Sequence, residues 1–404
     1  MLLLLLLAGG LITDPPSPPL TLADALARAR RTSPLREASA RLLTAADDAA
    51  SRAGRPLNPQ VDLRVENLGP TGQSALPKDV FAVVNQSIEL GGKRRLRREL
   101  STADRTAAEA QLGLTDWQVG ARTARLYVEA LRARLLLETL AANREGLAGM
   151  TATMRTRVKE GVAAEADLLK FDAETARLDL ELVHARVDLD RGLNELGYVI
   201  GMSGPPDPSR LVEPTSPPAP APDRAALTLK VSEHPDARLA SARVERARQA
   251  RALEQARRRP DPLLTAGYKR TAGVDTAVAG IALVLPVFDG NGVATARAEG
   301  DLRAAEAERN AVVGRLAADA MSLASAAQVL LARAGTVGRE LVAPAEAVRS
   351  ATQAALREGT ADVLRVLDAE RVVRDASRLA IELRLDALTA AVEARLAVGE
   401  EPLP

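Results

Sequence analysis

Apolar residues recur in alternating steps of three and four over two long stretches of the chain. The first stretch carries Leu100, Ala103, Ala107, Ala110, Leu114, Trp117, Ala121, Ala124, Val128, Leu131 and Leu135. The second carries Val366, Ala369, Val373, Ala376, Ala380, Leu383, Ala387, Ala390, Ala394 and Ala397. This repeat predicts long helices packed side by side with a slight supercoil. Because many of these positions are Ala, neighbouring helices can approach closely.

A second apolar stripe predicts a helix that packs on two of its sides. It consists of Leu168, Phe171, Leu178, Leu182, Ala185 and Leu189. A helix with two apolar seams suits a ring or wall of helices better than a simple pair.

Four shorter stretches alternate apolar with polar residues. The apolar positions are Val61, Leu63 and Val65, then Val84, Ile88 and Leu90, then Leu264, Ala266 and Tyr268, and finally Ile281, Leu283, Leu285 and Val287. This period of two predicts strands with one apolar and one polar face. Each stretch has about nine to eleven residues, enough for one tilted strand across a bilayer. Turn-rich loops around residues 69–79 and 271–275 join them in pairs.

Four strands of one chain cannot span a membrane alone, because open sheet edges would leave backbone groups unpaired in lipid. Further chains must close the sheet, and three chains of four strands would give about twelve, within the range of such barrels. A soluble alternative stays open, in which two β-hairpins cap a helical bundle.

One order of elements occurs twice, roughly 200 residues apart. The phrase VKEGVAAEADLLKFDAET at Val158–Thr175 is answered by LREGTADVLRVLDAER at Leu356–Arg371. A repeat of this kind indicates that a long unit was duplicated. Each copy is predicted to contain a helix of moderate length (21–53 and 223–257), two strands, a very long helix, a Gly turn and another long helix.

The predicted domain boundaries follow from this duplication. They are a signal-like N-terminus at 1–19, a first repeat at 20–202, a Pro-rich linker at 203–222, a second repeat at 223–398 and a tail at 399–404. The apolar run from Leu2 to Ile12 is shorter than the roughly 20 residues of a spanning helix and matches the core of a secretory signal, so we expect export. No other segment is predicted to be a membrane-spanning helix.

Composition narrows the class of protein. Aromatic residues make up 2% of the chain, and Ala and Leu dominate, which favours long helices. The net charge of +1 implies no polyanionic partner, and we expect no binding of nucleic acid. The absence of Cys excludes disulfides, thiolate metal sites, a catalytic Cys and an acylated lipoprotein Cys.

Four phrases in this order resemble a known family. They are NPQVDLRVEN, NQSIELGGKRR, LVAPAEAVRSA and EGTADVLRVLDAER. With the duplicated order of elements, they resemble the TolC-type outer-membrane efflux proteins, and within them the cobalt–zinc–cadmium resistance branch. The resemblance extends from about Leu20 to Ala397.

The resemblance implies a mainly helical fold with a small β part. Long coiled-coil hairpins and four strands per chain would build a trimer, with a twelve-stranded barrel in the bacterial outer membrane and a helical tunnel in the periplasm. The implied function is a passive conduit of a tripartite efflux system, with heavy-metal cations as candidate cargo. The implied partners are two further copies of the chain, a periplasmic adaptor (membrane fusion) protein, an inner-membrane pump of the resistance-nodulation-division type, and outer-membrane lipid.

The resemblance also makes the two helix reversals the periplasmic tips where the adaptor docks. The matching residues are Glu160, Gly161 and Val162 in the first copy and Glu358, Gly359 and Thr360 in the second. Glycine suits a reversal because it adopts positive φ at low cost. Both copies contain the phrase DAE after the reversal, and copy one has two extra residues between its glycine and this phrase. This difference predicts that the two tips have different shapes. An ordinary helical hairpin without a partner is the alternative.

The family closes its tunnel near these tips, partly with rings of acidic residues. Asp167 and Asp368 are the candidate gate residues in this chain. Members of the family carry an acidic residue directly before the phrase VLDA, where this chain has Arg365. This difference suggests a ring that is held together by Arg–Asp pairs. The alternative is that Asp368 is a helix-start or surface acid.

Nothing in the sequence indicates an enzyme, a cofactor or a metal site. His184 and His234 have no second His or Cys at metal-ligand spacing. The stretch GGKRRLRR at Gly91–Arg98 lacks the spacing of a phosphate loop, and fits a basic collar where membrane and periplasm meet. A periplasmic adaptor or a soluble coiled-coil scaffold remains the alternative function. The few aromatic residues in or near the strands (Phe81, Tyr268 and Phe288) are a departure from the aromatic girdles of most membrane barrels.

Overall fold

The computed structural model describes residues 18–68, 78–215, 223–358 and 360–402. These residues form two compact units, and each combines segments of both predicted repeats. Among the described residues, the helical unit draws on 18–34, 116–215, 223–228, 318–358 and 360–402. The sheet unit draws on 35–68, 78–115 and 229–317.

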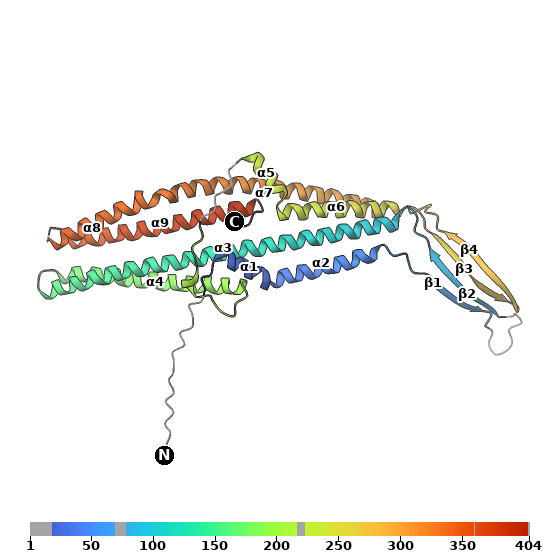
Figure 1. The fold of residues 1–404 in the computed structure, drawn as a ribbon, viewed down its shortest axis with the longest axis horizontal. Helices are drawn as coiled ribbons and strands as arrows, with labels where there is room; N and C mark the ends of the chain where they lie inside the picture. The colour runs from blue at the N-terminus through green and yellow to red at the C-terminus, as the bar shows by residue number, and fades with distance from the viewer. Residues whose placement is uncertain (1–17, 69–77, 216–222, 359, 403–404) are drawn as a thin grey trace, which may run out of the picture. The chain divides into compact units, whose positions relative to one another are not determined.

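Two helical hairpins dominate the helical unit (Figure 1). The first joins the end of α3 (Lys93–Lys159) to α4 (Glu165–Val199), and the second joins α8 (Ala343–Arg357) to α9 (Val363–Ala397). The predicted seams lie within α3 and α9, so the long helices are confirmed. Both returning helices begin four residues after their glycine, so the two extra residues of copy one lengthen α4 before DAE rather than its loop.

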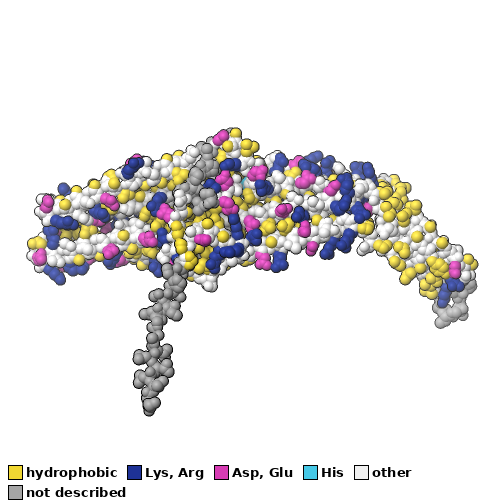
Figure 2. Space-filling view, viewed as in Figure 1, with side chains coloured by type: hydrophobic (Ala, Val, Ile, Leu, Met, Phe, Trp, Pro, Cys, Tyr) yellow, Lys and Arg dark blue, Asp and Glu magenta, His cyan; other side chains and the backbone are white. Residues whose placement is uncertain are grey.

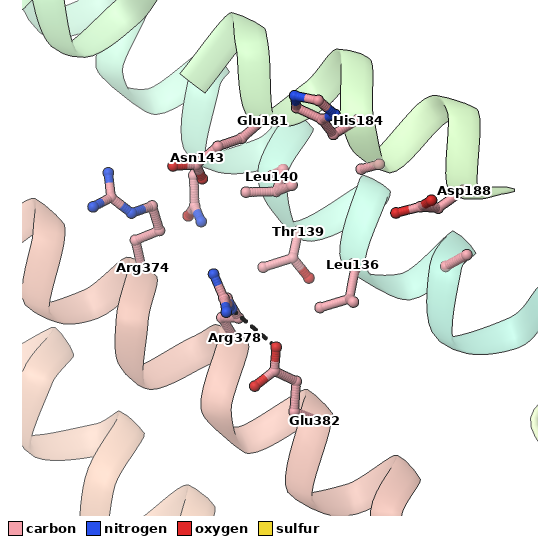
Figure 3. A pocket seen from close by; sticks show the side chains of 12 residues that line it. Leu136, Thr139, Leu140, Asn143, Glu181, His184, Asp188, Arg374, Arg378 and Glu382 are labelled. Atoms are coloured by element: carbon pink, nitrogen blue, oxygen red, sulfur yellow. Dashed lines mark hydrogen bonds and ion pairs between the residues drawn. The ribbon is translucent and has the colours of Figure 1, made fainter. Parts of the chain in front are cut away.

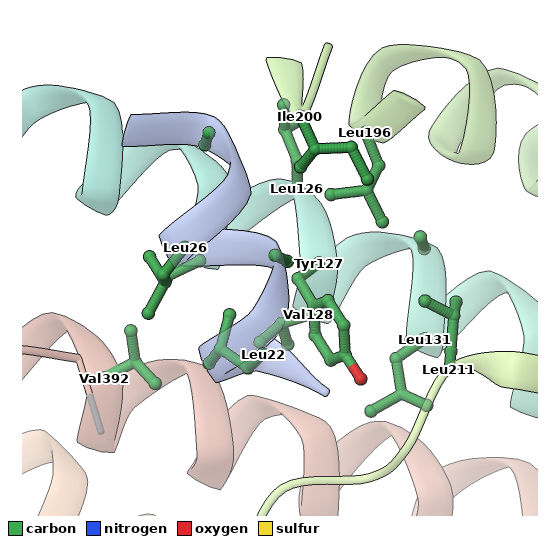
Figure 4. Close-up of a cluster of buried hydrophobic side chains, with 14 of the residues drawn as sticks. Leu22, Leu26, Leu126, Tyr127, Val128, Leu131, Leu196, Ile200, Leu211 and Val392 are labelled. Atoms are coloured by element: carbon green, nitrogen blue, oxygen red, sulfur yellow. The ribbon is translucent and has the colours of Figure 1, made fainter. Parts of the chain in front are cut away.

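The core of the helical unit surrounds Tyr127 of α3, which is fully buried (Figure 4). Leu22 and Leu26 of α1 (Leu22–Thr32) pack here with residues of α3, α4 and α9. A capping box fixes the start of α1, because Thr21 accepts a hydrogen bond from the Asp24 backbone while the Asp24 carboxylate accepts one from the Thr21 backbone.

The Tyr127 hydroxyl ties two passing segments to this core. It lies 2.7 Å from the carbonyl oxygen of Leu20 and 2.6 Å from that of Val212, and it accepts a bond from the Val212 backbone at 2.9 Å. Burial raises the pKa of Tyr127 to about 12, so the hydroxyl keeps its proton. Leu20 also pairs with Leu211 after the short helix η1 (Pro208–Arg210), so the segment predicted as a linker is fastened here.

The two moderate helices were each predicted as one piece, and this was wrong. The first divides into α1 and α2 (Pro34–Ala53), and the second into α5 (Arg224–Ser232) and α6 (Pro235–Ala256). Each break precedes a proline, whose ring disfavours helical backbone in the residue before it. Ser33 and His234 accordingly have extended ψ angles of 117° and 139°.

The sheet unit contains one antiparallel sheet in the order β1–β2–β3–β4 (Figure 1). The strands are β1 (Gln60–Glu66), β2 (Asp79–Ser87), β3 (Pro262–Thr271) and β4 (Val274–Leu283). Ala272 and Gly273 join β3 to β4 with φ angles of 52° and 84°, as a tight hairpin requires. Most of the predicted loop at 69–79 and the signal-like run lie outside the described residues.

The alternation predicted through Leu285 and Val287 was wrong as a strand. β4 ends at Leu283, and Pro286 follows, which has no backbone N–H to offer a neighbouring strand. Ile88 and Leu90 likewise lie beyond the end of β2.

The very long helix predicted for the second copy is continuous except for one π-helical turn. After α7 (Gly292–Val337) a π-helical turn, η2 (Gly338–Val342), leads directly into α8. Contrary to the sequence prediction, Gly292–Arg357 is one described stretch long and apolar enough to cross a membrane, with 22% of its apolar window buried. An exposed, Ala-rich helix surface of this kind also suits packing against further helices.

Candidate functional site

The register of the sheet places apolar side chains on one face of all four strands. One row pairs Leu63 with Ala82, Ala82 with Tyr268 and Tyr268 with Ala277. The other residues of this face include Val61, Val65, Val80, Val84, Leu264, Ala266, Ala279 and Ile281. The register also places Arg270 and Asp275 on this face beside the β3–β4 turn, where they lie 3.6 Å apart. Leu63 is 74% exposed and Ile281 is 76% exposed, so nothing in the described chain covers this face.

Polar and charged side chains gather on the opposite face. Asp62 and Glu66 lie 3.2 Å and 3.3 Å from the Arg64 guanidinium. Phe81 is on this face too, between Arg64 and Lys269, whose charged groups lie 5.8 Å and 4.7 Å from its ring centre. The sheet therefore separates an apolar surface from a hydrated one, as a wall between lipid and water requires.

Both edges of this sheet are open among the described residues, because β1 pairs only with β2 and β4 only with β3. Exposed edges present unpaired backbone N–H and C=O groups. The sheet therefore needs strands from outside the described chain if it is to lie in lipid.

The first predicted tip is a closely bonded reversal after α3. Gly161 has a φ of 75° and donates to the Val158 carbonyl at 3.0 Å, and Val162 donates to the Arg157 carbonyl at 2.9 Å. The Val162 side chain is 61% exposed. The turn thus provides hydrogen-bond donors for the last carbonyl groups of α3, and it presents an apolar side chain to solvent.

The second tip follows α8 and has a similar pattern. Glu358 donates to the Ala354 carbonyl at 3.1 Å, and Thr360 donates to the Ala355 carbonyl at 2.9 Å. Gly359 lies outside the described residues. Arg157 of the first hairpin donates to the Leu356 carbonyl at 3.3 Å, so the two tips lie together.

The predicted gate residues occupy corresponding positions with their charges exchanged. Asp167 and Arg365 are each the third residue of their helix, while Lys170 and Asp368 are each the sixth. Asp167 lies 2.9 Å from Lys170, and Asp368 lies 3.7 Å from Arg371. Within the described residues no ion pair joins Asp167 or Arg365 to Asp368. We call the third and the sixth helix positions two levels of the tip. At each level, one chain therefore carries one negative and one positive side chain.

A buried ion pair between the two hairpins was not anticipated from the sequence. Glu174 of α4 lies 2.5 Å from Arg374 and 2.8 Å from Arg371, both of α9. The Glu174 and Arg374 side chains are only 6% and 8% exposed. Glu174 is the last residue of the repeated phrase DAE, and this repetition was the only feature of the sequence that drew attention to it. The corresponding acid of the other copy, Glu370, forms a different contact, a hydrogen bond with Gln353 at 2.8 Å.

Opposing effects set the acidity of Glu174. Burial acts to raise its pKa, but the hydrogen bonds and charges of Arg371 and Arg374 outweigh burial, and the pKa lies below its ordinary value. The carboxylate is therefore ionised at neutral pH, and it joins α4 to α9.

An open cavity of about 350 Å³ lies beside this pair, between α3, α4 and α9 (Figure 3). Arg374 and Arg378 line it from α9, and His184 and Asp188 line it from α4. Arg378 is held by Glu382 at 2.9 Å. In the part of the chain that the structure describes, no cluster of three His, Cys, Asp or Glu side chains could hold a metal ion.

The family comparison agrees with this architecture. Residues 228–400 match the family described as outer membrane efflux protein. The matched stretch covers most of the second predicted repeat, so this part of the chain carries the family's domain. The resemblance inferred from the sequence is thereby confirmed, and so is the expected outer-membrane location.

One relative of the efflux protein is the cobalt-zinc-cadmium resistance protein CzcC of Cupriavidus metallidurans. The two are 26% identical over 369 residues, which cover 88% of this chain and 84% of CzcC.

Solved structures share the fold along nearly the whole chain. The outer membrane protein VceC of Vibrio cholerae superposes with a TM-score of 0.78 at 22% identity, covering 94% of this chain and 96% of VceC. CusC, whose structures describe transmembrane channel formation, gives a TM-score of 0.78 at 15% identity, covering 94% and 92%. The predicted fold class, mainly helical with a small β part, is confirmed.

Proposed function

We propose that this efflux protein is the outer-membrane channel of a tripartite export system, and that three copies form it. The observation that carries the proposal is the sheet, which has one uncovered apolar face, one charged face and two open edges. Pairing β4 of one copy with β1 of the next would remove every edge and close about twelve strands around a hydrated lumen. The channel is a passive conduit, and its residues carry out no reaction.

Adaptor docking is assigned to the tips. Glu160, Gly161 and Val162 lie at one reversal, and Glu358, Gly359 and Thr360 lie at the other. The Arg157–Leu356 bond supports a joint surface, because it holds the two turns together. A periplasmic adaptor would contact this surface and connect the channel to an inner-membrane pump of the resistance-nodulation-division type.

The gate is assigned to the helix starts at the tips. Asp167 and Arg365 form one level, and Asp368 forms the next with Lys170. Three copies would place three positive and three negative side chains at each level, so pairing between hairpins can close the tunnel without a purely acidic ring. The buried Glu174–Arg374 pair supports this assignment, because it fixes α4 against α9 behind these levels.

Divalent heavy-metal cations are the proposed cargo, on the strength of the similarity to the cobalt-zinc-cadmium resistance protein. A conduit needs no tight metal site, because its cargo must leave as readily as it enters.

Purification from membranes in mild detergent tests the channel. We expect a trimer by mass, and discrete ion-conducting steps when it is added to a planar bilayer. A monomer that stays in solution without detergent would contradict the proposal.

A growth assay tests the cargo. Deleting the gene should increase sensitivity to cobalt, zinc and cadmium, and re-expressing the chain should restore tolerance. Unchanged metal tolerance together with sensitivity to organic compounds would reassign the cargo while leaving the channel intact.

A further inference from the structure

The base of the sheet carries a concentration of positive charge that the channel function does not explain. The segments 52–55, 89–99 and 254–261 meet there, and we call them the collar. They contain ten Lys or Arg against four Asp or Glu, whereas the whole chain has a net charge of +1. Figure 2 shows Lys and Arg side chains gathered where the helices meet the hydrophobic sheet.

Part of this charge is structural and internally paired. Lys93 is buried and lies 2.8 Å from the Asp261 carboxylate, and Arg97 lies 2.7 Å from Glu89. Arg97 also donates to the Arg55 carbonyl at 2.9 Å, and Arg94 donates to the Gly54 carbonyl. These bonds join the three segments of the collar into one surface.

The remaining collar cations face solvent. Arg52, Arg55, Arg98, Arg258 and Arg259 are exposed and form no ion pair with any carboxylate in the described residues. Their charge is therefore available to an anionic partner from outside the chain.

A ring of exposed apolar side chains borders the collar on the sheet side. Phe288 is 102% exposed, and Val284 is 81% exposed. The other members are Leu57, Ile88, Leu90, Leu283, Leu285 and Val287. Cations beside exposed apolar groups match a lipid surface, where charged groups reach the headgroups while apolar groups enter the acyl region.

The far end of the strands differs. Its described charges are Arg64, Glu66, Lys78, Asp79, Lys269, Arg270 and Asp275, which nearly balance. The excess of positive charge is thus confined to the end of the sheet that is joined to the helices.

We propose that the collar binds anionic phospholipid headgroups, and so fixes how deeply the sheet sits in the membrane. This inference rests on the proposed function: with the sheet in the outer membrane and the helices in the periplasm, the collar would lie at the periplasmic leaflet. Arg55, Arg98, Arg258 and Arg259 bind the phosphates, and Phe288 with its apolar neighbours inserts beside them. Nucleic acid fits the surface less well, because the arginines border an apolar band rather than a polar groove.

Native mass spectrometry of the detergent-purified full-length assembly tests the collar. Equal amounts of phosphatidylglycerol and phosphatidylcholine with identical chains are added, and the retained lipids are counted. The collar variant carries Arg55→Gln, Arg98→Gln, Arg258→Gln and Arg259→Gln. The matched control carries Arg31→Gln, Arg122→Gln, Arg243→Gln and Arg303→Gln, which are also exposed and form no carboxylate pair in the described chain.

We expect wild type and control to prefer phosphatidylglycerol, and the collar variant to lose that preference by on the order of tenfold. Replacing the same four collar residues with Lys should preserve it, which separates loss of charge from loss of fold. Equal preference in the collar variant and wild type would overturn the inference. So would displacement of the bound lipid by millimolar inorganic phosphate, since that marks a small-anion site. An assembled, conducting channel without lipid preference would contradict only this inference. A protein that is absent from the membrane fraction would contradict the proposed function.

Discussion

At the scale of single residues, the buried Glu174–Arg374 pair has a large effect on stability. A buried ion pair repays its desolvation only when both charges are present, so removing one partner leaves an uncompensated charge. Tyr127 is a neutral counterpart, because its buried hydroxyl lies within hydrogen-bond distance of backbone groups of Leu20 and Val212.

We predict that Glu174→Gln destabilises the helical unit by about 3 kcal/mol, because the buried Arg374 then keeps only the exposed Asp375 carboxylate, 3.4 Å away, as a counter-charge. Thermal unfolding of the detergent-purified protein measures this loss. Asp368→Asn is the control, since Asp368 is 71% exposed and should cost almost nothing. Replacing both Glu174 and Arg374 with Leu should recover much of the stability. Equal melting temperatures for Glu174→Gln and wild type would show that the pair is not coupled to folding.

The contribution of Glu174 also has a defined pH dependence. Its pKa in the folded protein lies below the ordinary value of 4.5, so the pair stabilises the fold fully above that pH. Stability is lost as pH falls below 4.5 through the folded pKa, because the unfolded chain then binds the proton more readily. Unfolding curves from pH 7 to pH 3 should therefore show an acid-dependent component that is absent from the Glu174/Arg374 double Leu variant. The same acid profile in both proteins would assign the component to other carboxylates.

At the scale of elements, the sheet is defined by the difference between its two faces. Leu63 and Val83 lie near the middle of the neighbouring strands β1 and β2, but their side chains belong to opposite faces of the sheet. The pleat alternates sides residue by residue, so in the proposed channel the same substitution would meet lipid at one position and the lumen at the other.

We predict that Leu63→Arg prevents stable membrane assembly, because a charge at the middle of the lipid face costs about 2–4 kcal/mol per copy. Val83→Arg on the hydrated face, near Asp62, should assemble nearly as well as wild type. The measurement is the fraction of protein that is trimeric in isolated outer membranes. Equal assembly of both variants would show that the apolar face does not contact lipid.

At the scale of the whole molecule, the proposed docking of a periplasmic adaptor assigns a partner contact to the tips of the helical hairpins. We predict that Val162→Glu lowers cross-linking to the adaptor on the order of tenfold, because it places a desolvated charge in the contact. Val187→Glu on α4 is the control, since Val187 is also exposed but lies well away from the turn. Both variants should remain trimeric in the outer membrane. Normal cross-linking of Val162→Glu would place the docking surface elsewhere.

The sequence by itself determined the elements and their duplication. The seams in α3 and α9 and the alternation in the strands are local patterns, since packing and pleat impose fixed periods on neighbouring residues. Local chemistry also explains the errors. The prolines at 34, 235 and 286 ended elements that the apolar pattern alone would have continued.

Only the tertiary structure decided which repeated residues do different work. Glu174 and Glu370 stand in the same phrase, yet one forms a buried ion pair across the hairpins and the other bonds to its own hairpin. The structure also showed that Asp167 and Arg365, which have opposite charges, occupy the same position in their respective helices. Such pairings join residues about 200 positions apart, and no local period encodes a contact over that separation.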